Sequence, residues 1–375
     1  MLLSKLGVQH VRNLVEQQVE FCPGVNLILG PNGSGKSSLL ESIYLLGYGR
    51  SFRSAYTKLL IQFNQSVLAI SAEIQSDQGD SYRFVYQKTA QGKMSAQLNH
   101  EAITFIDMIR FLPIQMIHPE SFEQIYSGAL PRRKILDWGM FHVEPSFGRL
   151  WVNYQQVLKQ RNSALKQALN HNEIKCWDVL LSGLGAQIEH LRQKWMDSFL
   201  SEIQLAAGQL LPDLAKDLVL SYKPGWRVQN KALNLSLNLN LELSLSEALA
   251  STFVRDKLLG VTQVGPHRAD LSMRYQGFPV EKVLSRGQQK LLMMAIFMAQ
   301  ARWLKTQAGK KSLLLIDDII SELDNCNIEK LLAFIQSQQQ QVLISTVDQK
   351  GLNFGDKIAD LHLFYLKKGK VEKQD

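Results

Sequence analysis

The stretch GPNGSGKS, from Gly30 to Ser37, decides how this 375-residue sequence can fold. It follows a short apolar run at residues 25–29 and precedes SSLLESIYLLGYG, whose apolar residues recur with helical spacing. Strand, glycine-rich loop and helix in this order are typical of a P-loop, whose backbone N–H groups point at phosphate oxygens. A glycine-rich turn without a ligand is the alternative, and the flanking strand and helix disfavour it.

The residue types of this loop match the chemistry of a nucleoside triphosphate. Glycines allow a tight turn, and the start of the following helix adds partial positive charge. Lys36 supplies a point charge for the β and γ phosphates, and the Ser37 hydroxyl is placed to bind Mg²⁺. The predicted ATP-binding residues are therefore Gly30, Pro31, Asn32, Gly33, Ser34, Gly35, Lys36, Ser37 and Ser38.

A second motif, SLLLIDDIISELD, supplies the carboxylates that a P-loop site requires. An apolar run at residues 313–316 predicts a buried strand, and Asp317 at its carboxyl end is the predicted Mg²⁺ ligand. Asp318 points differently and is the predicted catalytic residue, which orients or deprotonates the attacking water. Taken alone, the motif also fits an acidic turn after a strand.

The segment LSRGQQK, residues 284–290, resembles the LSGGQ signature of ABC-type ATPases, with Arg286 in place of one glycine. That resemblance implies that the signature of one copy contacts the γ-phosphate bound to another copy, so the protein forms an ATP-dependent homodimer. The signature residues are Ser285, Arg286, Gly287 and Gln288, and the matching D-loop residue is Asp324. Taken alone, Ser285 before a glycine also fits a helix N-cap.

The distance between the motifs, from Ser37 to Ser285, predicts an insertion too long for a transporter ATPase and too short for an SMC coiled coil. We expect an α/β fold: an ABC-type P-loop ATPase head formed by N- and C-terminal lobes, with an inserted, mainly helical arm. The predicted domains are residues 1–125, 126–258 and 259–375.

Charge gives weaker guidance. The formal net charge of +8 favours a polyanionic partner. Between residues 126 and 200, ten Lys or Arg stand against six Asp or Glu. Arg132 and Arg133 in this segment could contact DNA phosphates or lie on a solvated helix face. The N-terminal stretch has no apolar signal segment and no run is long enough to span a membrane, so we expect a cytoplasmic protein without a membrane partner.

Three further positions leave alternatives open. Gln115, in FLPIQMIHPESF, is either a Q-loop residue near Mg²⁺ or a strand position facing solvent. Thr346 is the nearest candidate for a γ-phosphate sensor, because the usual H-loop histidine is absent after QVLIS. The stretch LNLSLNLNLELSLSEAL, residues 233–249, alternates Leu with polar residues and predicts a strand through Leu245.

Segments outside the ATPase motifs make the chain resemble the RecF family of bacterial recombination and gap-repair ATPases. They are GYGRSFR (47–53), RRKILDWGMFHVEP (132–145), LKQRNSALK (158–166) and TQVGPHRADL (262–271). The resemblance implies binding to gapped DNA and to single-strand/double-strand junctions, weak DNA-dependent ATP hydrolysis as a dimerisation switch, and cooperation with RecO and RecR in loading RecA. An ABC transporter-type ATPase subunit and a non-catalytic, ATP-gated DNA scaffold are the alternatives.

Overall fold

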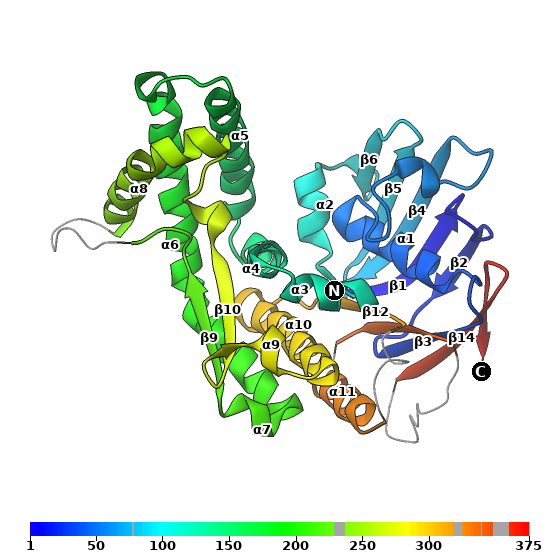
Figure 1. Cartoon of the computed structure of the whole chain (residues 1–375). Helices are drawn as coiled ribbons and strands as arrows, with labels where there is room; N and C mark the ends of the chain where they lie inside the picture. Colours follow the sequence, from blue (N-terminus) through cyan, green and yellow to red (C-terminus); the bar gives the residue numbers. More distant parts are fainter. Residues whose placement is uncertain (77–78, 229–236, 319–324, 339, 348–359, 375) are drawn as a thin grey trace. The chain divides into compact units, whose positions relative to one another are not determined.

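The computed structural model describes residues 1–76, 79–228, 237–318, 325–338, 340–347 and 360–374. The chain forms two compact units (Figure 1). The first combines Met1–Phe122 with Lys290–Asp375, and the second comprises Glu123–Gln289. Residues 259–289, which the sequence analysis assigned to the C-terminal lobe of the head, therefore group by their contacts with the second unit.

The first unit contains an antiparallel sheet of strand order β2-β1-β4-β5-β6-β7. Its strands alternate between buried and exposed residues, as expected when one face of a sheet is covered and the other faces solvent. The bounds are β1 (Leu2–Gln9), β2 (Gln17–Glu20), β4 (Val67–Gln75), β5 (Ser81–Thr89), β6 (Met94–Leu98) and β7 (Glu101–Ala102).

The second sheet of this unit has the order β15-β14-β3-β13-β12-β8, and all neighbours except β15 run parallel. Every residue of β3, β12 and β13 is buried, which explains why apolar residues predominate in them. The bounds are β3 (Val25–Leu29), β8 (Ile114–Ile117), β12 (Leu313–Asp317), β13 (Val342–Thr346), β14 (Leu361–Lys367) and β15 (Lys370–Gln374).

Helix α1 (Lys36–Tyr48) is the centre of the first unit. Eleven of its residues are buried, and it packs on β8, β12, β13 and α2. One hydrophobic cluster joins it to side chains of both sheets, including Leu6 of β1, Ile70 of β4 and Leu315 of β12. A helix that is apolar on all sides belongs inside a core. The other helices are η1 (Thr57–Leu59), α2 (Phe105–Phe111), α11 (Asn325–Gln338) and most of α10 (Arg286–Ala308).

The second unit is mainly helical and holds a small antiparallel sheet of order β11-β10-β9. The 40-residue helix α6 packs against α5 and α8, yet no helix in the described residues is long and apolar enough to cross a bilayer. The elements are the end of α3 (Pro119–Tyr126), α4 (Ala129–Val143), α5 (Phe147–Lys166), α6 (His171–Leu210), α7 (Pro212–Ala215), β9 (Leu218–Lys223), α8 (Leu237–Leu259), η2 (Pro266–Arg268), β10 (Asp270–Tyr275), β11 (Phe278–Pro279) and α9 (Val280–Val283).

A buried polar network ties these helices together around Arg161, whose side chain is fully buried. Its guanidinium donates to Asp178 of α6 at 2.6 Å, to Asp256 of α8 at 2.8 Å and to the Thr262 hydroxyl at 2.8 Å. A buried charge is tolerated when such partners surround it. Arg161 belongs to the LKQRNSALK segment and Thr262 to TQVGPHRADL, so these two segments meet in the core of the second unit.

The strand predicted from the alternating leucines is wrong. Residues 233–236 lie outside the described residues, and Leu237 onward forms helix α8. Leu241, Leu245 and Leu249 are buried at intervals of four, while Leu243 is 41% exposed. The alternation misled because leucine is a strong helix former, and α8, which packs against α6, buries only the leucines that recur every fourth residue from Leu241.

This register predicts different costs for two neighbouring truncations. Leu245→Ala removes a side chain that is 1% exposed and should lower the free energy of unfolding by about 2–5 kcal/mol. Leu243→Ala should change it by less than about 1 kcal/mol, because that residue is already 41% exposed and leaves no buried cavity. Urea denaturation followed by circular dichroism measures both. Equal losses would contradict the helix, since residues two apart share one face only in a strand.

Candidate phosphate-binding site

The loop Gly30–Ser37 connects the end of β3 to the start of α1 and has the backbone that close approach to an anion requires. Gly33 and Gly35 have φ angles of +79° and +113°, which other residues rarely adopt. A Cβ on Gly35 would lie 3.0 Å from side-chain atoms of Leu14 and Leu366. The loop is therefore held between neighbouring segments, with the N-terminus of α1 at its end.

The buried Ser34 hydroxyl is a further sign of an anion site. Its Oγ is shielded from solvent and finds no hydrogen-bond partner within the part of the chain that the structure describes. A buried polar atom without a partner is costly, so its presence within a glycine-rich loop indicates that an added ligand satisfies it. Phosphate oxygens are suitable acceptors for this hydroxyl and for the N–H groups at the start of α1.

Lys36 lies in the mouth of the loop. Its Nζ donates to the carbonyl oxygens of Gly30 at 2.6 Å and Pro31 at 3.2 Å. Burial lowers the pKa of this ammonium, while the nearby carboxylates of Asp318 and Asp317 raise it. The amine is thus held beside the loop by weak neutral acceptors that phosphate oxygens can replace.

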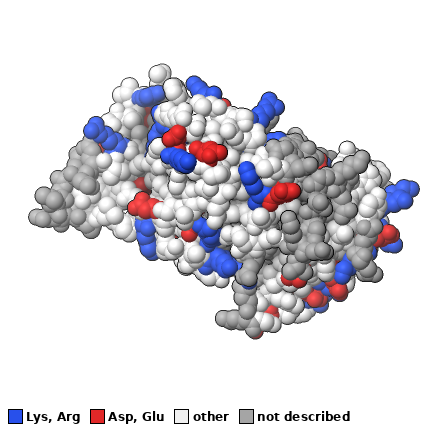
Figure 2. Space-filling model, turned by 90° about the horizontal axis from the view of Figure 1, so that it is seen from below, with Lys and Arg blue, Asp and Glu red and all other residues white. Residues whose placement is uncertain are grey.

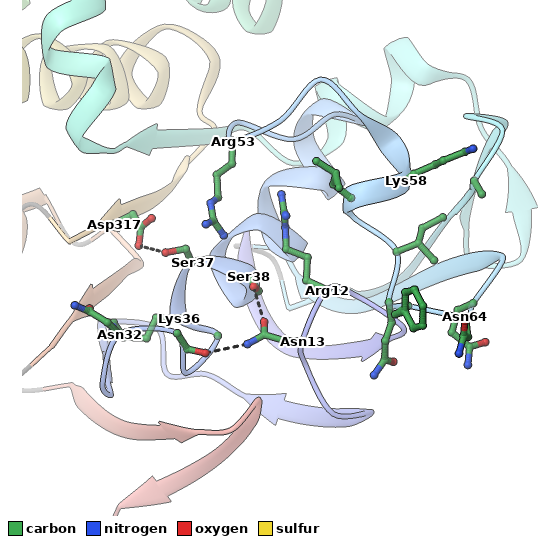
Figure 3. Close-up of a pocket in the computed structure, with 18 of the residues that line it drawn as sticks. Arg12, Asn13, Asn32, Lys36, Ser37, Ser38, Arg53, Lys58, Asn64 and Asp317 are labelled. Atoms are coloured by element: carbon green, nitrogen blue, oxygen red, sulfur yellow. Dashed lines mark hydrogen bonds between the residues drawn. The ribbon is translucent and has the colours of Figure 1, made fainter.

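Ser37 and Asp317 meet at the edge of the parallel sheet. The Ser37 hydroxyl donates to Asp317 Oδ1 at 3.1 Å, although the two residues are far apart in sequence (Figure 3). A hydroxyl and a carboxylate converging in this way are hard oxygen donors suited to Mg²⁺, which takes few protein ligands alongside phosphates and water. The residues present therefore fit both phosphate and the metal.

Ser345 is a member of this site that the sequence analysis missed. It pairs with Asp317 in the register of β12 and β13, and its hydroxyl donates to Asp317 Oδ1 at 2.5 Å. The Ser345 Oγ in turn accepts the N–H of Asp318 at 3.1 Å. The signal was a serine at the end of the apolar run QVLIS, whose meaning depends on strand pairing. Ser345 holds the Asp317 carboxylate in one orientation.

Asp318 leaves the strand in a left-handed conformation with φ +52°. This turn separates its direction from that of Asp317, and both residues line one cleft. Left-handed backbone in a non-glycine residue costs energy and often marks a functional position. The prediction that Asp318 acts on water remains a prediction, and this geometry supports it.

The cleft has a volume of about 700 Å³, within the usual range for small-molecule sites. The phosphate loop with Asn32 and Lys36 lies at one end, and Lys58 and Asn64 lie at the other (Figure 3). Its remaining lining residues include Arg12, Asn13, Arg53, Ile61, Gln62, Phe63, Gln65, Asp317 and Asp318.

Asn13 links the loop after β1 to the phosphate loop and was also missed. Its Nδ2 donates to the Gly33 carbonyl at 3.1 Å, and its Oδ1 accepts from the Ser38 hydroxyl at 2.9 Å. Arg12 beside it forms a bidentate ion pair with the fully buried Glu41 of α1. These contacts fix the start of α1 from a segment that carries no recognisable motif.

Gln115 does not reach this site. It is 1% exposed in the middle of β8, and its amide is occupied by neighbours. The Gln115 Nε2 donates to the Phe297 carbonyl and to Gln300 Oε1, while the Gln115 Oε1 accepts from the Ser312 hydroxyl. The structure therefore does not support a Q-loop role beside the metal. The alternative, a strand position facing solvent, is wrong because Gln115 is buried against α10.

Ser285 caps helix α10, as the alternative interpretation anticipated. Its Oγ accepts the Gln288 N–H at 3.3 Å, and its own N–H donates to Gln288 Oε1 at 2.9 Å. Ser285, Arg286 and Gln288 are nevertheless exposed. A Cβ on Gly287 would meet no described atom within 4 Å, so packing within the described chain does not demand glycine there. The segment is available to a partner.

Arg132 and Arg133 are engaged inside the second unit, so the predicted DNA contacts are corrected. Arg132 donates to both carboxylate oxygens of Asp270 at 2.8 and 2.9 Å, with its side chain 12% exposed. The buried Arg133 donates to the Ala269 carbonyl. Both guanidinium groups hold the start of β10. Because these partners already occupy them, the two side chains have little freedom to contact a phosphate.

Two predicted residues, Thr346 and Asp324, remain untested. Thr346 is buried at the end of β13 beside Leu29 and stays a candidate sensor. Asp324 lies outside the described residues.

Basic and acidic side chains are interspersed on the face seen in Figure 2. The net positive charge therefore does not form one patch on that face.

A P-loop and an acidic strand end on a two-sheet head, with a capped signature segment, define an ABC-type P-loop ATPase of the SMC-like class. A family model described as RecF/RecN/SMC N terminal domain matches residues 2–368. The chain is 36% identical over 377 residues to the DNA replication and repair protein RecF of Aliivibrio fischeri (strain MJ11), and 99% of each chain is covered. A RecF of Histophilus somni (strain 129Pt) is 36% identical over 374 residues, again covering 99% of each. The chain belongs to the RecF family.

Solved structures agree with this assignment. The structure of the recombination mediator protein RecF-ATPrS in the RecFOR pathway matches with a TM-score of 0.86 and 25% identity, covering 100% of this chain and 98% of that one. An Smc head bound to the C-winged helix domain of ScpA matches with a TM-score of 0.59 and 14% identity, covering 100% and 98%, which shows a shared fold.

The internal role of Arg132 predicts a stability effect. Arg132→Ala should lower the free energy of unfolding by about 1–3 kcal/mol, because it leaves Asp270 without its charged partner. Lys134→Ala, on the same helix but exposed, is the control and should change stability by less than about 0.5 kcal/mol. Urea denaturation measures both variants. Unchanged stability of Arg132→Ala combined with weaker DNA binding would restore the original DNA assignment.

Proposed function

We propose that this chain is an ATP-dependent DNA-binding protein of recombinational repair and replication maintenance. It binds ATP and Mg²⁺ in the cleft of the first unit and acts as an ATP-induced homodimer on gapped DNA and single-strand/double-strand junctions. The observation that carries the proposal is the convergence of the phosphate loop, Ser37 and Asp317 at one end of the cleft.

The roles of the loop residues follow from their positions. The N–H groups of residues 33–37 and the Ser34 hydroxyl bind phosphate oxygens, and Lys36 adds its charge to the β and γ phosphates. Ser37 and Asp317 would hold Mg²⁺, which neutralises phosphate charge when bound. The relatives solved with ATP or ATPrS in the RecFOR pathway support the choice of nucleotide.

Hydrolysis is proposed to be weak and DNA-dependent, and to act as the switch that separates the dimer. Asp318 orients or deprotonates the attacking water, and its left-handed backbone aims it differently from Asp317. An aspartate reaches one methylene less far than the glutamate that many ABC-type ATPases carry here, which fits slow turnover. If ATP only holds a scaffold together, Asp318→Asn will leave the turnover rate at its wild-type value.

The dimer is proposed to complete each site in trans. Ser285, Arg286, Gly287 and Gln288 are accessible on the second unit, while the phosphate loop belongs to the first. Gly287 has open space around it, so a phosphate of a partner's nucleotide could approach its backbone. Asp324 is proposed to act beside this contact as the D-loop residue.

The partners are proposed from the relatives. Proteins named RecF for DNA replication and repair, and the structures of the RecFOR pathway, support DNA as the ligand and RecO and RecR as partners in loading RecA. The net charge of +8 agrees with a polyanion and predicts binding that weakens steeply with salt. A transporter-type ATPase finds no support in the buried arm network or in these relatives.

Sedimentation with and without ATP and Mg²⁺ tests the shared site. The wild-type protein should dimerise with ATP, and Ser285→Arg should stay monomeric while binding ATP with unchanged affinity. Lys36→Ala should weaken ATP binding about 10- to 100-fold, because charged hydrogen bonds to the phosphates are lost. Ser251→Arg, at an exposed position of α8, is the control. A wild-type protein that remains monomeric with bound ATP would refute the trans model.

A second variant tests how Asp317 is positioned. Ser345→Ala removes the hydroxyl that fixes this carboxylate and should lower the apparent affinity for Mg²⁺ about 10- to 100-fold in the presence of ATP. ATP binding without metal should stay unchanged. Ser42→Ala, which removes another buried hydroxyl of the same unit, controls for loss of stability. An unaltered Mg²⁺ titration curve would exclude a role for Ser345 in orienting Asp317.

A further inference from the structure

The end of the cleft away from the phosphate loop carries an aromatic side chain that packing does not explain. Phe63 is 89% exposed, more than any other large apolar side chain in the described part of the chain. It lines the same cleft as the phosphate loop. A solvated phenyl ring gains nothing for folding, since its apolar surface stays in water. Its place in a nucleotide cleft therefore points to a ligand that covers it.

Phe63 lies at the tip of a hydrogen-bonded turn. The residues Gln62 to Gln65 form a tight turn, closed by the Gln65 N–H donating to the Gln62 carbonyl at 3.0 Å. Phe63 and Asn64 are the two central residues, and Asn64 adopts a left-handed φ of +65°. Asparagine tolerates this conformation better than most residues do. Gln62, Asn64 and Gln65, its neighbours in the turn, are also exposed and line the same cleft.

This turn is tied to the phosphate loop through one short segment. Gln62 N–H donates to the His10 carbonyl and Arg12 N–H donates to the Leu60 carbonyl, each at 2.9 Å. Asn13, the next residue, donates to Gly33 of the phosphate loop at 3.1 Å. The two ends of the cleft are thus connected by backbone hydrogen bonds and four consecutive residues. Their spacing is fixed before a ligand enters.

We propose that Phe63 is a stacking platform for the purine base of the bound nucleotide, with the amides of Gln62, Asn64 and Gln65 at the base edge. The proposal rests on the ATP-binding function proposed above. With the triphosphate in the loop, a base at the other end of the cleft meets an aromatic face and groups that both donate and accept hydrogen bonds. Amide side chains are suited to adenine, which offers both a donor and acceptors.

A protein interface is the competing use of this ring. Tyr56 and Leu59 are also exposed, at 74% and 57%, on the preceding segment. However, Leu59 and Phe63 both line the cleft, together with the amide residues Gln62, Asn64 and Gln65. Stacking on a base needs one ring face, whereas a stable interface needs a larger apolar core. A ligand that has the phosphates but no base distinguishes the two uses, because only base stacking makes ATP binding depend on Phe63 while binding of the base-free ligand does not.

The experiment compares ATP with inorganic tripolyphosphate, which has the phosphates and no base. Dissociation constants are measured by calorimetry with Mg²⁺ for the wild type, Phe63→Ala, Phe63→Trp and the control Phe278→Ala, an exposed phenylalanine of the second unit. Phe63→Ala should weaken ATP binding about tenfold and change tripolyphosphate binding less than twofold. Phe63→Trp should retain ATP affinity, and Phe278→Ala should match the wild type.

Each other outcome overturns a defined statement. If Phe63→Ala binds ATP like the wild type, the stacking platform is refuted while the ATP-binding function stands. Equal weakening of ATP and tripolyphosphate refutes it too and assigns the ring to the shape of the cleft. Normal binding by monomers but loss of ATP-driven dimerisation assigns it to an interface between copies. Absence of wild-type binding to both ligands refutes the ATP-binding function and the platform together.

Discussion

The burial of helix α1 on every side is the constraint on which the rest of the first unit depends. Because apolar side chains surround it, α1 needs both sheets and cannot form at the surface. Its first residue, Lys36, is then fixed at the carboxyl end of β3, and its N–H groups face the edge of the parallel sheet. The buried Glu41, held by Arg12, adds a polar anchor inside this packing. The position of the phosphate loop is therefore a property of the whole core.

The second unit uses polar rather than apolar interactions for its most specific contacts. Arg161 joins three segments of helix and loop, and Arg132 grips Asp270 at the start of β10. The Arg132–Asp270 pair lies at the start of β10, from which the chain runs through β11 and α9 to Ser285. Removing one partner of a buried pair costs far more than an exposed pair contributes. The arginines that looked like DNA ligands serve this architecture.

Local sequence was sufficient for the parts of the site whose chemistry depends on neighbours in the chain. The phosphate loop, the strand before Asp317 and the cap at Ser285 all have short-range signals. The roles of Asn13 and Ser345 were beyond reach, because both depend on contacts between distant segments. Asn13 bonds to the phosphate loop through its side chain, and Ser345 meets Asp317 through strand pairing. Gln115 was misjudged for the same reason, because its buried amide bonds to distant partners on α10 and next to β12. The leucine run failed because periodicity cannot separate a strand from a helix when every second residue is a strong helix former.

The order of the parallel sheet has a consequence for synthesis of the chain. Strand β3 pairs with β13 and β14, which begin at residues 342 and 361. The Gly369 N–H also donates to Ser34 O at 2.8 Å. The phosphate loop and β3 leave the ribosome before β13 and β14 are made, so β3 acquires its neighbours late, whereas the contiguous second unit can fold earlier. Until β13 has been synthesised, the nascent chain carries β3 without either of its sheet neighbours, and such an unpaired apolar strand is prone to aggregate.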